Sequence, residues 1–194
     1  MHTRATPTFV ADEKLATLSR GRWNWRTIAF AATTFVVVFE LAAGSVWNLM
    51  RIEWIRLQLD HLGYPLYFAY ISGVWQTGGA AAIVVPGFPR LKEWAYAGAF
   101  FTWSGAVASH LLAGDGVEVW LPPLVFLMFG IASWALRSAD RRLPSAGLAP
   151  DPTLRAWAAP IGLLILLYVA SLLTLPWVNV TFHQKAVDLG WIPR

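Results

Sequence analysis

Five apolar stretches, each long enough to cross a lipid bilayer, constrain this sequence more than any other feature. A helix needs about 20 mostly apolar residues to span the hydrocarbon core of a membrane. The stretches cover residues 27–49, 64–85, 94–113, 120–136 and 157–178 of the 194-residue chain. We therefore predict an all-α polytopic membrane protein, with a four-helix transmembrane bundle followed by a fifth, C-terminal transmembrane helix.

The composition supports this fold class and excludes others. Hydrophobic residues make up 57% of the chain and charged residues 13%, against about 25% charged residues in soluble domains. The chain has no cysteine, which excludes disulfides and thiolate-bound clusters. Its net charge of +4 does not indicate a nucleic-acid partner, because the cations lie between apolar runs instead of on a polar, aromatic-rich surface. The partner that the composition does predict is the lipid bilayer.

The distribution of cations indicates the direction of each span. Eleven of the fifteen Lys and Arg residues lie in the N-terminal arm and in the loops after the second and fourth stretches, and four lie on the opposite side. Because basic loops stay in the cytoplasm, we predict a cytoplasmic N-terminus and an outside C-terminus. The predicted parts are a basic cytoplasmic arm (1–26), the four-helix bundle (27–138), a cytoplasmic linker (139–156), the fifth helix (157–178) and an extracytoplasmic tail (179–194).

Two ionisable side chains in the predicted spans are the candidate catalytic residues. Glu40 is the only carboxylate deep in a span, where a charge normally faces a partner or a water-filled cavity. We favour a functional role for Glu40 over one as hydrogen-bonding glue between helices. His110 lies about one turn from the outer end of the third span, and for it the functional and structural interpretations stay equally open.

Other side chains are candidate ligand contacts in the outer half of the bundle. Amides inside a span serve more often as glue between helices than as ligands, and the two tryptophans can either flank an aromatic ligand or face lipid. We expect these residues to meet Glu40 and His110 in one polar region. The candidates are Asn48, Ser72, Trp75, Gln76, Trp103 and Asp115.

Small residues recur every four positions along the third span. Gly98, Thr102 and Ala106 form a stripe that leads to His110, and small residues at this spacing allow helices to approach closely in lipid. We therefore expect tight packing in the inner half of the bundle and more open packing where the polar residues lie.

Several catalytic and metal-binding patterns do not occur in the sequence. It contains no HExxH, no ExxH pair and no GxSxG, the patterns typical of zinc proteases, di-metal bundles and serine hydrolases. His2, His61 and His183 lie outside the predicted spans, so none of them pairs with His110 around a haem. The sequence therefore predicts no metal site.

One segment resembles a known family. The run from Lys92 to Gly98, KEWAYAG, is followed by Ser-His at 109–110 and Gly-Asp at 114–115. This arrangement resembles the DoxX-like family of small bacterial membrane proteins, over about residues 30–138. The motif residues that carry the resemblance are Lys92, Glu93, Trp94, Tyr96 and Gly98.

The resemblance implies a four-helix bundle in the bacterial inner membrane, to which the fifth helix is an addition. DoxX itself is the membrane subunit of a thiosulfate:quinone oxidoreductase, so the resemblance also implies an oxidoreductase subunit, with a quinone as its ligand and a redox partner protein. The chain supplies no electron carrier of its own, and no cofactor follows from its residues.

Two functions from different classes remain in view. The leading hypothesis is an accessory subunit, or a binder of a quinone or another lipophilic small molecule, in the outer half of the bundle. The alternative is a stand-alone membrane enzyme in which Glu40 and His110 act as an acid–base pair on a lipophilic substrate. A transporter is less favoured, because the inner halves of the second and third spans are apolar.

Overall fold

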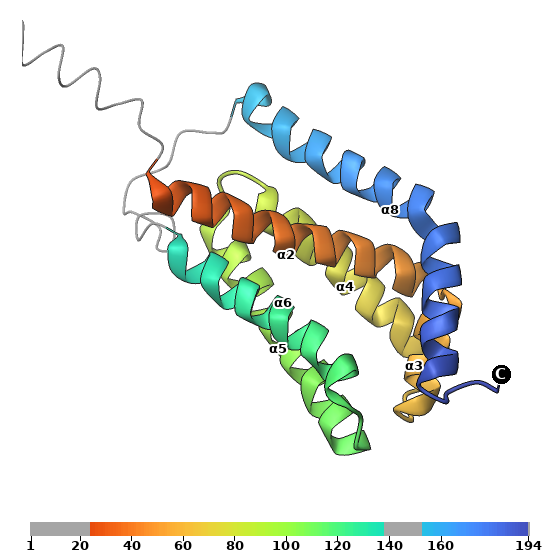
Figure 1. The fold of residues 1–194 in the computed structure, drawn as a ribbon. Coiled ribbons are helices and arrows are strands. Elements are labelled where there is room, and N and C mark those ends of the chain that lie inside the picture. Colours follow the sequence, from red (N-terminus) through yellow and green to blue (C-terminus); the bar gives the residue numbers. More distant parts are fainter. Residues whose placement is uncertain (1–23, 138–152, 194) are drawn as a thin grey trace, which may run out of the picture.

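The computed structural model describes residues 24–137 and 153–193, and within those ranges all regular structure is helical. The elements are α2 (Trp25–Met50), α3 (Glu53–His61), α4 (Tyr67–Val84), α5 (Pro89–Ala113), α6 (Val117–Leu136) and α8 (Leu154–Asp188) (Figure 1). The prediction of an all-α protein is confirmed. Most of the predicted arm and of the predicted linker lies outside the described residues.

Three of these helices, α2, α6 and α8, are long and apolar enough to cross a membrane. The other two predicted spans correspond to α4 and α5, which fold as helices but are less apolar because Gln, Thr, Gly, Trp and His interrupt their aliphatic residues. By length and composition, therefore, the structure supports a membrane protein with three candidate spans among its described residues.

Four helices form a closed ring, and a fifth lies outside it. Helix α2 packs against α4 and α6, and α5 packs against the same two helices from the opposite corner. Helix α8 lies along the outside of α2 and also touches α3 and α4 (Figure 1). The ring encloses a core that includes Val37, Val38, Leu41, Ala80 and Trp103. The predicted four-helix bundle with one added helix thus describes the packing correctly.

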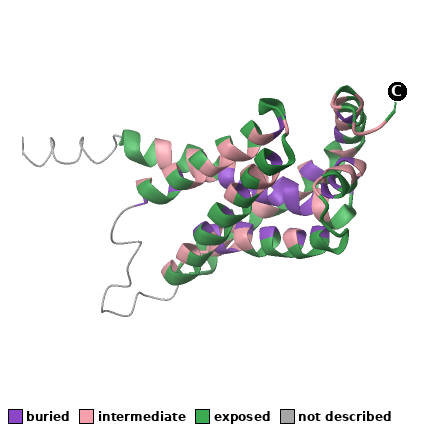
Figure 2. Cartoon of the chain, turned by 90° about the horizontal axis from the view of Figure 1, so that it is seen from below, coloured by how far each residue is buried: buried purple, intermediate pink, exposed green. Residues whose placement is uncertain are grey.

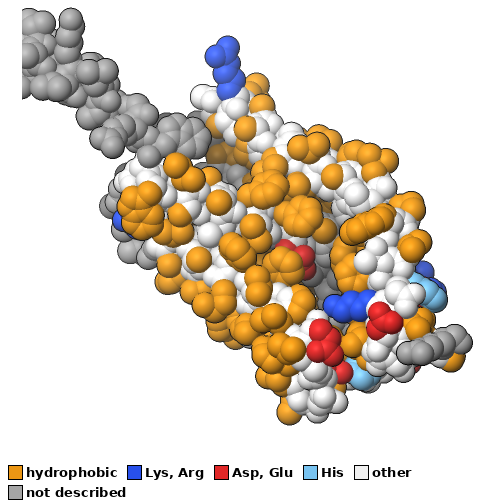
Figure 3. Space-filling model, in the orientation of Figure 1, with side chains coloured by type: hydrophobic (Ala, Val, Ile, Leu, Met, Phe, Trp, Pro, Cys, Tyr) orange, Lys and Arg blue, Asp and Glu red, His pale blue; other side chains and the backbone are white. Residues whose placement is uncertain are grey.

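The surface of the molecule is apolar, as a lipid-facing surface requires. Buried residues gather between the helices and exposed residues lie on the outer faces (Figure 2), and many of these exposed residues are large and hydrophobic. Leu173 on α8 is 76% exposed and Phe101 on α5 is 71% exposed. In Figure 3 most of the charged and histidine side chains gather at the end of the molecule near α3, a basic side chain stands out at the start of α8, and hydrophobic side chains cover most of the face shown.

The end near α3 differs from the sequence prediction. Residues 53–61 were expected in a loop, but they form α3, and α8 continues to Asp188 through most of the predicted tail. A second apolar core joins the two helices, with Trp54, Ile55 and Leu59 of α3 against Val178 and Ala186 of α8. The sequence did not predict these helical segments because their apolar side chains are too few to indicate a membrane span. They are enough, however, for the two helices to pack against each other.

Candidate functional site

Four polar side chains form a cluster at the end of the bundle near α3, which we call the histidine cluster: Gln58, His61, His110 and Asp115. Asp115 Oδ2 lies 2.6 Å from His110 Nδ1, and Asp115 Oδ1 lies 2.7 Å from His61 Nε2. Gln58 Nε2 lies 2.9 Å from His110 Nε2. These contacts fit a neutral His110 that donates from Nδ1 to the carboxylate and accepts from the amide of Gln58.

The end of α5 places His110 and Asp115 together. Gly114 adopts the left-handed conformation with φ 80, and the backbone N–H of Asp115 bonds to the carbonyl of His110 at 3.0 Å. Glycine reaches this conformation without the steric cost that other residues meet. The turn therefore brings the Asp115 carboxylate beside the ring of His110, which is fully buried.

Hydrogen bonds control the ionisation of Asp115. Partial loss of solvent raises the pKa of this carboxyl, but the hydrogen bonds from His110 and His61 outweigh that effect and hold the pKa below its ordinary value of 3.8. The folded protein therefore favours the ionised carboxylate. The cluster fastens α3 to the end of α5.

The lowered pKa of Asp115 predicts a loss of stability in acid. A group whose pKa is lower in the folded state stabilises the fold fully above its unfolded-state pKa, and this contribution falls as the pH drops through the folded-state pKa. We expect Asp115→Asn to remove this part of the pH dependence. The check is thermal unfolding in a non-ionic detergent between about pH 6 and pH 3. Parallel curves for the wild type and the variant across that range would contradict the assignment.

The structure does not bring Glu40 to His110. Thr34 and Tyr96 both bond to the hydroxyl of Ser133, at 2.7 and 2.8 Å, so these positions of α2 and α5 lie at one depth. From that depth, Glu40 is about 9 Å and His110 about 21 Å along the respective helices, at 1.5 Å per residue. The two side chains do not meet, because Glu40 lies just past the middle of α2 and about 12 Å short of the depth of His110, which is near the end of α5.

Glu40 itself is half-buried on α2 and makes no hydrogen bond or ion pair with the described residues. His110, by contrast, has both ring nitrogens in use within the histidine cluster. This geometry does not support an acid–base pair formed by these two residues.

Two of the candidate ligand contacts, Asn48 and Gln76, bond to each other. Asn48 Nδ2 donates to Gln76 Oε1 at 3.1 Å and to the carbonyl of Gly44 at 2.8 Å. A Cβ on Gly44 would lie only 3.0 Å from Gln76 Nε2, so the missing side chain of Gly44 makes room for the amide. Ser72 is half-buried and lies one turn from Gln76, outside this pair.

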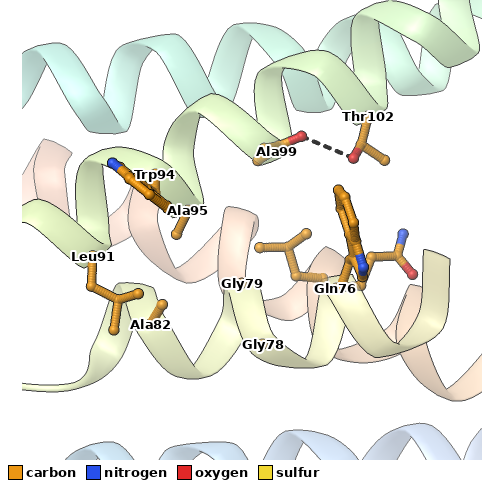
Figure 4. Close-up of a pocket in the computed structure, with 12 residues that line it drawn as sticks. Gln76, Gly78, Gly79, Ala82, Leu91, Trp94, Ala95, Ala99 and Thr102 are labelled. Carbon is orange, nitrogen blue, oxygen red and sulfur yellow. Dashed lines mark hydrogen bonds between the residues drawn. The ribbon is translucent and has the colours of Figure 1, made fainter. Parts of the chain in front are cut away.

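A groove between α4 and α5 contains two of the predicted ligand contacts. Its volume is about 380 Å³, and its lining includes Trp75 of α4 and Leu41 of α2. Gln76, Trp94 and Thr102 also lie along it (Figure 4). Trp75 is 73% exposed. Trp103 does not contribute, since it is buried against Phe126 and Gly130 in the core.

The groove corrects two expectations about packing. It runs from the level of Gln76 toward the start of α5, so it occupies the half of the bundle away from His110, where tight packing was expected. A Cβ on Gly78 or on Gly98 would meet no atom within 4 Å. These small residues leave an open groove because no neighbouring helix fills the space, whereas Gly44 and Gly73 make the close helix contacts.

The motif at the start of α5 forms a polar network with α6. Glu93 Oε1 lies 2.7 Å from Arg137 Nη1, and the indole N–H of Trp134 donates to Glu93 Oε2 at 2.6 Å. The guanidinium of Arg137 also lies 5.5 Å from the centre of the Tyr96 ring. Lys92 donates to the carbonyl of Ile83 on α4. The motif therefore ties α5 to both neighbouring helices.

Sequence reasoning missed the partners of this motif. The sequence presents Arg137 only as one of the basic residues that orient the spans, and no pattern in it singles out Trp134, Ser133 or Thr34. The available signal was the position of Arg137 directly after an apolar stretch, since a cation at that boundary often needs an acidic partner. Among the described residues, no group of three His, Asp or Glu side chains is arranged to hold a metal ion.

Comparison of this chain with known proteins shows which family it belongs to. Neither the curated proteins nor the solved structures gave a match. A family model described as the DoxX-like family matches residues 32–133, more than half of the chain, from α2 to the last turns of α6. The match includes the four-helix ring, the motif at the start of α5 and the histidines of the cluster, and the chain belongs to the DoxX-like family.

Proposed function

We propose that this DoxX-like protein binds a lipophilic small molecule with ring carbonyls, of the quinone class, in the groove between α4 and α5. The observation that carries the proposal is the groove itself. Apolar side chains make up most of its lining, and few polar groups lie in it, which is the usual make-up of a small-molecule site.

Gln76 supplies the polar contact for the proposed ligand. Its Oε1 accepts from Asn48, and its Nε2 donates to no described residue. An amide N–H₂ in an apolar groove is a suitable donor to a ligand carbonyl. Trp75 and Trp94 add aromatic surface on which a flat ring can stack. Asn48 acts through Gln76, because its hydrogen bond to Oε1 fixes which end of the amide is left to donate.

The proposal includes the membrane topology. We propose that α4 and α5 cross the bilayer together with α2, α6 and α8, since the ring of four helices packs as one unit. The cation distribution supports a cytoplasmic N-terminus and an outside C-terminus in a bacterial inner membrane. A redox role for this protein requires a partner that supplies electrons, so the proposed role is that of an accessory subunit.

We expect a larger side chain in the groove to block the ligand. The test is photolabelling of the purified protein in nanodiscs with a diazirine derivative of a short-chain ubiquinone, followed by peptide mapping. Gly98→Leu fills the groove and should reduce labelling of α4 and α5 by about tenfold. Gly98 has open space beside it, so the added side chain should not disturb the fold.

Gly105→Leu is the matched control. Gly105 lies two turns further along α5, also beside open space, and does not line the groove. This variant should be labelled like the wild type. Equal labelling of Gly98→Leu and wild type, or labelling confined to other helices, would refute the proposed site.

A further inference from the structure

A second groove lies between α5 and α6, on the side of the ring that α8 does not cover. Its volume is about 620 Å³. The walls are apolar, with Phe100 on α5 and Leu127 and Ile131 on α6. Phe100 and Ile131 are each more than 40% exposed, and α8 packs instead against α2, α3 and α4. The groove therefore opens to the surface that faces lipid.

One end of this groove is polar. Glu93 lies there with Trp94 and Trp134, and these tryptophans are 80% and 40% exposed. Exposed tryptophans beside charged residues are typical of the boundary between hydrocarbon and headgroups. The groove thus begins at headgroup level and continues into the apolar depth of the bilayer, which is the course of a lipid acyl chain.

The charge at the polar end favours a particular headgroup. The side chain of Arg137 is only 2% exposed, while that of its partner Glu93 is 33% exposed, so the carboxylate is the part of the pair that a ligand in the groove meets. Each oxygen of Glu93 accepts one hydrogen bond from Arg137 or Trp134. A carboxylate oxygen has room for a second donor.

A basic residue that can bind the phosphate of a lipid headgroup lies close to Glu93. Arg90 is exposed on α5, three residues before Glu93, and residues at this spacing lie on the same face of a helix. An anion at Glu93 and a cation one turn away complement a zwitterion that carries a phosphate and an ammonium group.

We propose that the α5–α6 groove is a binding site for one phospholipid with a primary ammonium headgroup, as in phosphatidylethanolamine. The acyl chain lies in the groove, the ammonium donates to Glu93, and the phosphate contacts Arg90. A quaternary ammonium has no N–H to donate, and an anionic headgroup without an ammonium is repelled by the carboxylate. The site is separate from the groove between α4 and α5, although Trp94 stands between the two.

The test compares three lipids on the intact chain. The protein is placed in nanodiscs of equal parts phosphatidylethanolamine, phosphatidylcholine and phosphatidylglycerol with identical acyl chains. Native mass spectrometry then counts the molecules of each lipid that stay bound to the protein when it is released from the nanodisc. We expect phosphatidylethanolamine to be retained about fivefold over each of the others. Equal retention of the three, or a preference for either of the others, would overturn the proposal.

Two variants separate the headgroup contact from the groove. Glu93→Gln should bring phosphatidylethanolamine to the level of phosphatidylcholine, and an unchanged preference would overturn the headgroup assignment. Because Glu93→Gln can also weaken the fold, a second variant acts on the groove alone. Ala97→Phe fills the groove and should abolish retention, whereas Ala108→Phe, on the same face three turns further along α5, should not. Retention that survives Ala97→Phe would overturn the proposed site.

Discussion

Replacement of Glu93 by leucine should lower the free energy of unfolding by about 3 kcal/mol. The guanidinium of Arg137 is almost fully covered, and the substitution removes the carboxylate that lies 2.7 Å from it. Breaking such a pair costs this much because the guanidinium stays out of water and loses the carboxylate that compensates its charge. The indole N–H of Trp134 loses its acceptor at the same time. The loss can be measured by SDS titration in mixed micelles.

Glu118→Leu is the control for this experiment. Glu118 is exposed in the first turn of α6, so its replacement should cost no more than about 0.5 kcal/mol, the size of a helix-dipole effect. If Glu93→Leu were no more destabilising than Glu118→Leu, the network between α5 and α6 would contribute nothing to stability.

Replacement of His110 by leucine should cost about 2 kcal/mol and should act mainly on α3. The side chain is fully buried and bonds to both Gln58 and Asp115. Leucine fills a similar volume but leaves the amide of Gln58 without its partner, and a buried polar group without a partner is costly. Hydrogen exchange should therefore quicken in α3 (Glu53–His61) more than in α2 or α4.

The neighbouring residue provides the comparison. Ser109 bonds to the hydroxyl of Tyr64 at 2.8 Å, and both side chains lie near the surface, so water replaces this bond when it is lost. Ser109→Ala should leave exchange in α3 unchanged. The interpretation fails if exchange in α3 responds equally to the two substitutions, or to neither.

The sequence predicted the long helices well because each one buries or presents a continuous apolar surface. The expected stretch 27–49 corresponds to α2 (Trp25–Met50), and 120–136 corresponds to α6 (Val117–Leu136). The remaining differences are at helix ends. For α5, the expected start at residue 94 was five residues late, because Pro89 begins the helix before its apolar part. Proline is well suited to a first helical turn.

The site was predicted less well, because the type of a residue does not show its depth along the bundle or the direction in which its side chain points. Gln76 and Asn48 were expected together and do bond, since a buried amide needs a partner whichever helix supplies it. Glu40 and His110 were expected together on the assumption of one shared polar region. Their separation depends on the register of α2 against α5, which the contacts of Thr34 and Tyr96 with Ser133 show.

Glycine gave the most ambiguous signal. Gly98 and Gly73 look alike in the sequence, each among small residues in an apolar stretch. A Cβ on Gly73 would lie 2.7 Å from Leu49 Cγ, whereas one on Gly98 would meet nothing within 4 Å. The first glycine allows a close helix contact and the second leaves a groove, and only the position of the neighbouring helix separates the two cases.

The packing of α8 on α3 has a consequence for the order of assembly. Residues 154–188 leave the ribosome after all four helices of the ring. Until they do, the apolar side of α3 lacks the cover that α8 supplies. The aromatic contact of Trp54 with Phe182, at 4.9 Å between ring centroids, cannot form before then. The ring can close while the chain is still being made, but α3 reaches its final environment only after synthesis has passed α8. A chain interrupted before α8 should therefore insert normally and expose α3 to proteases.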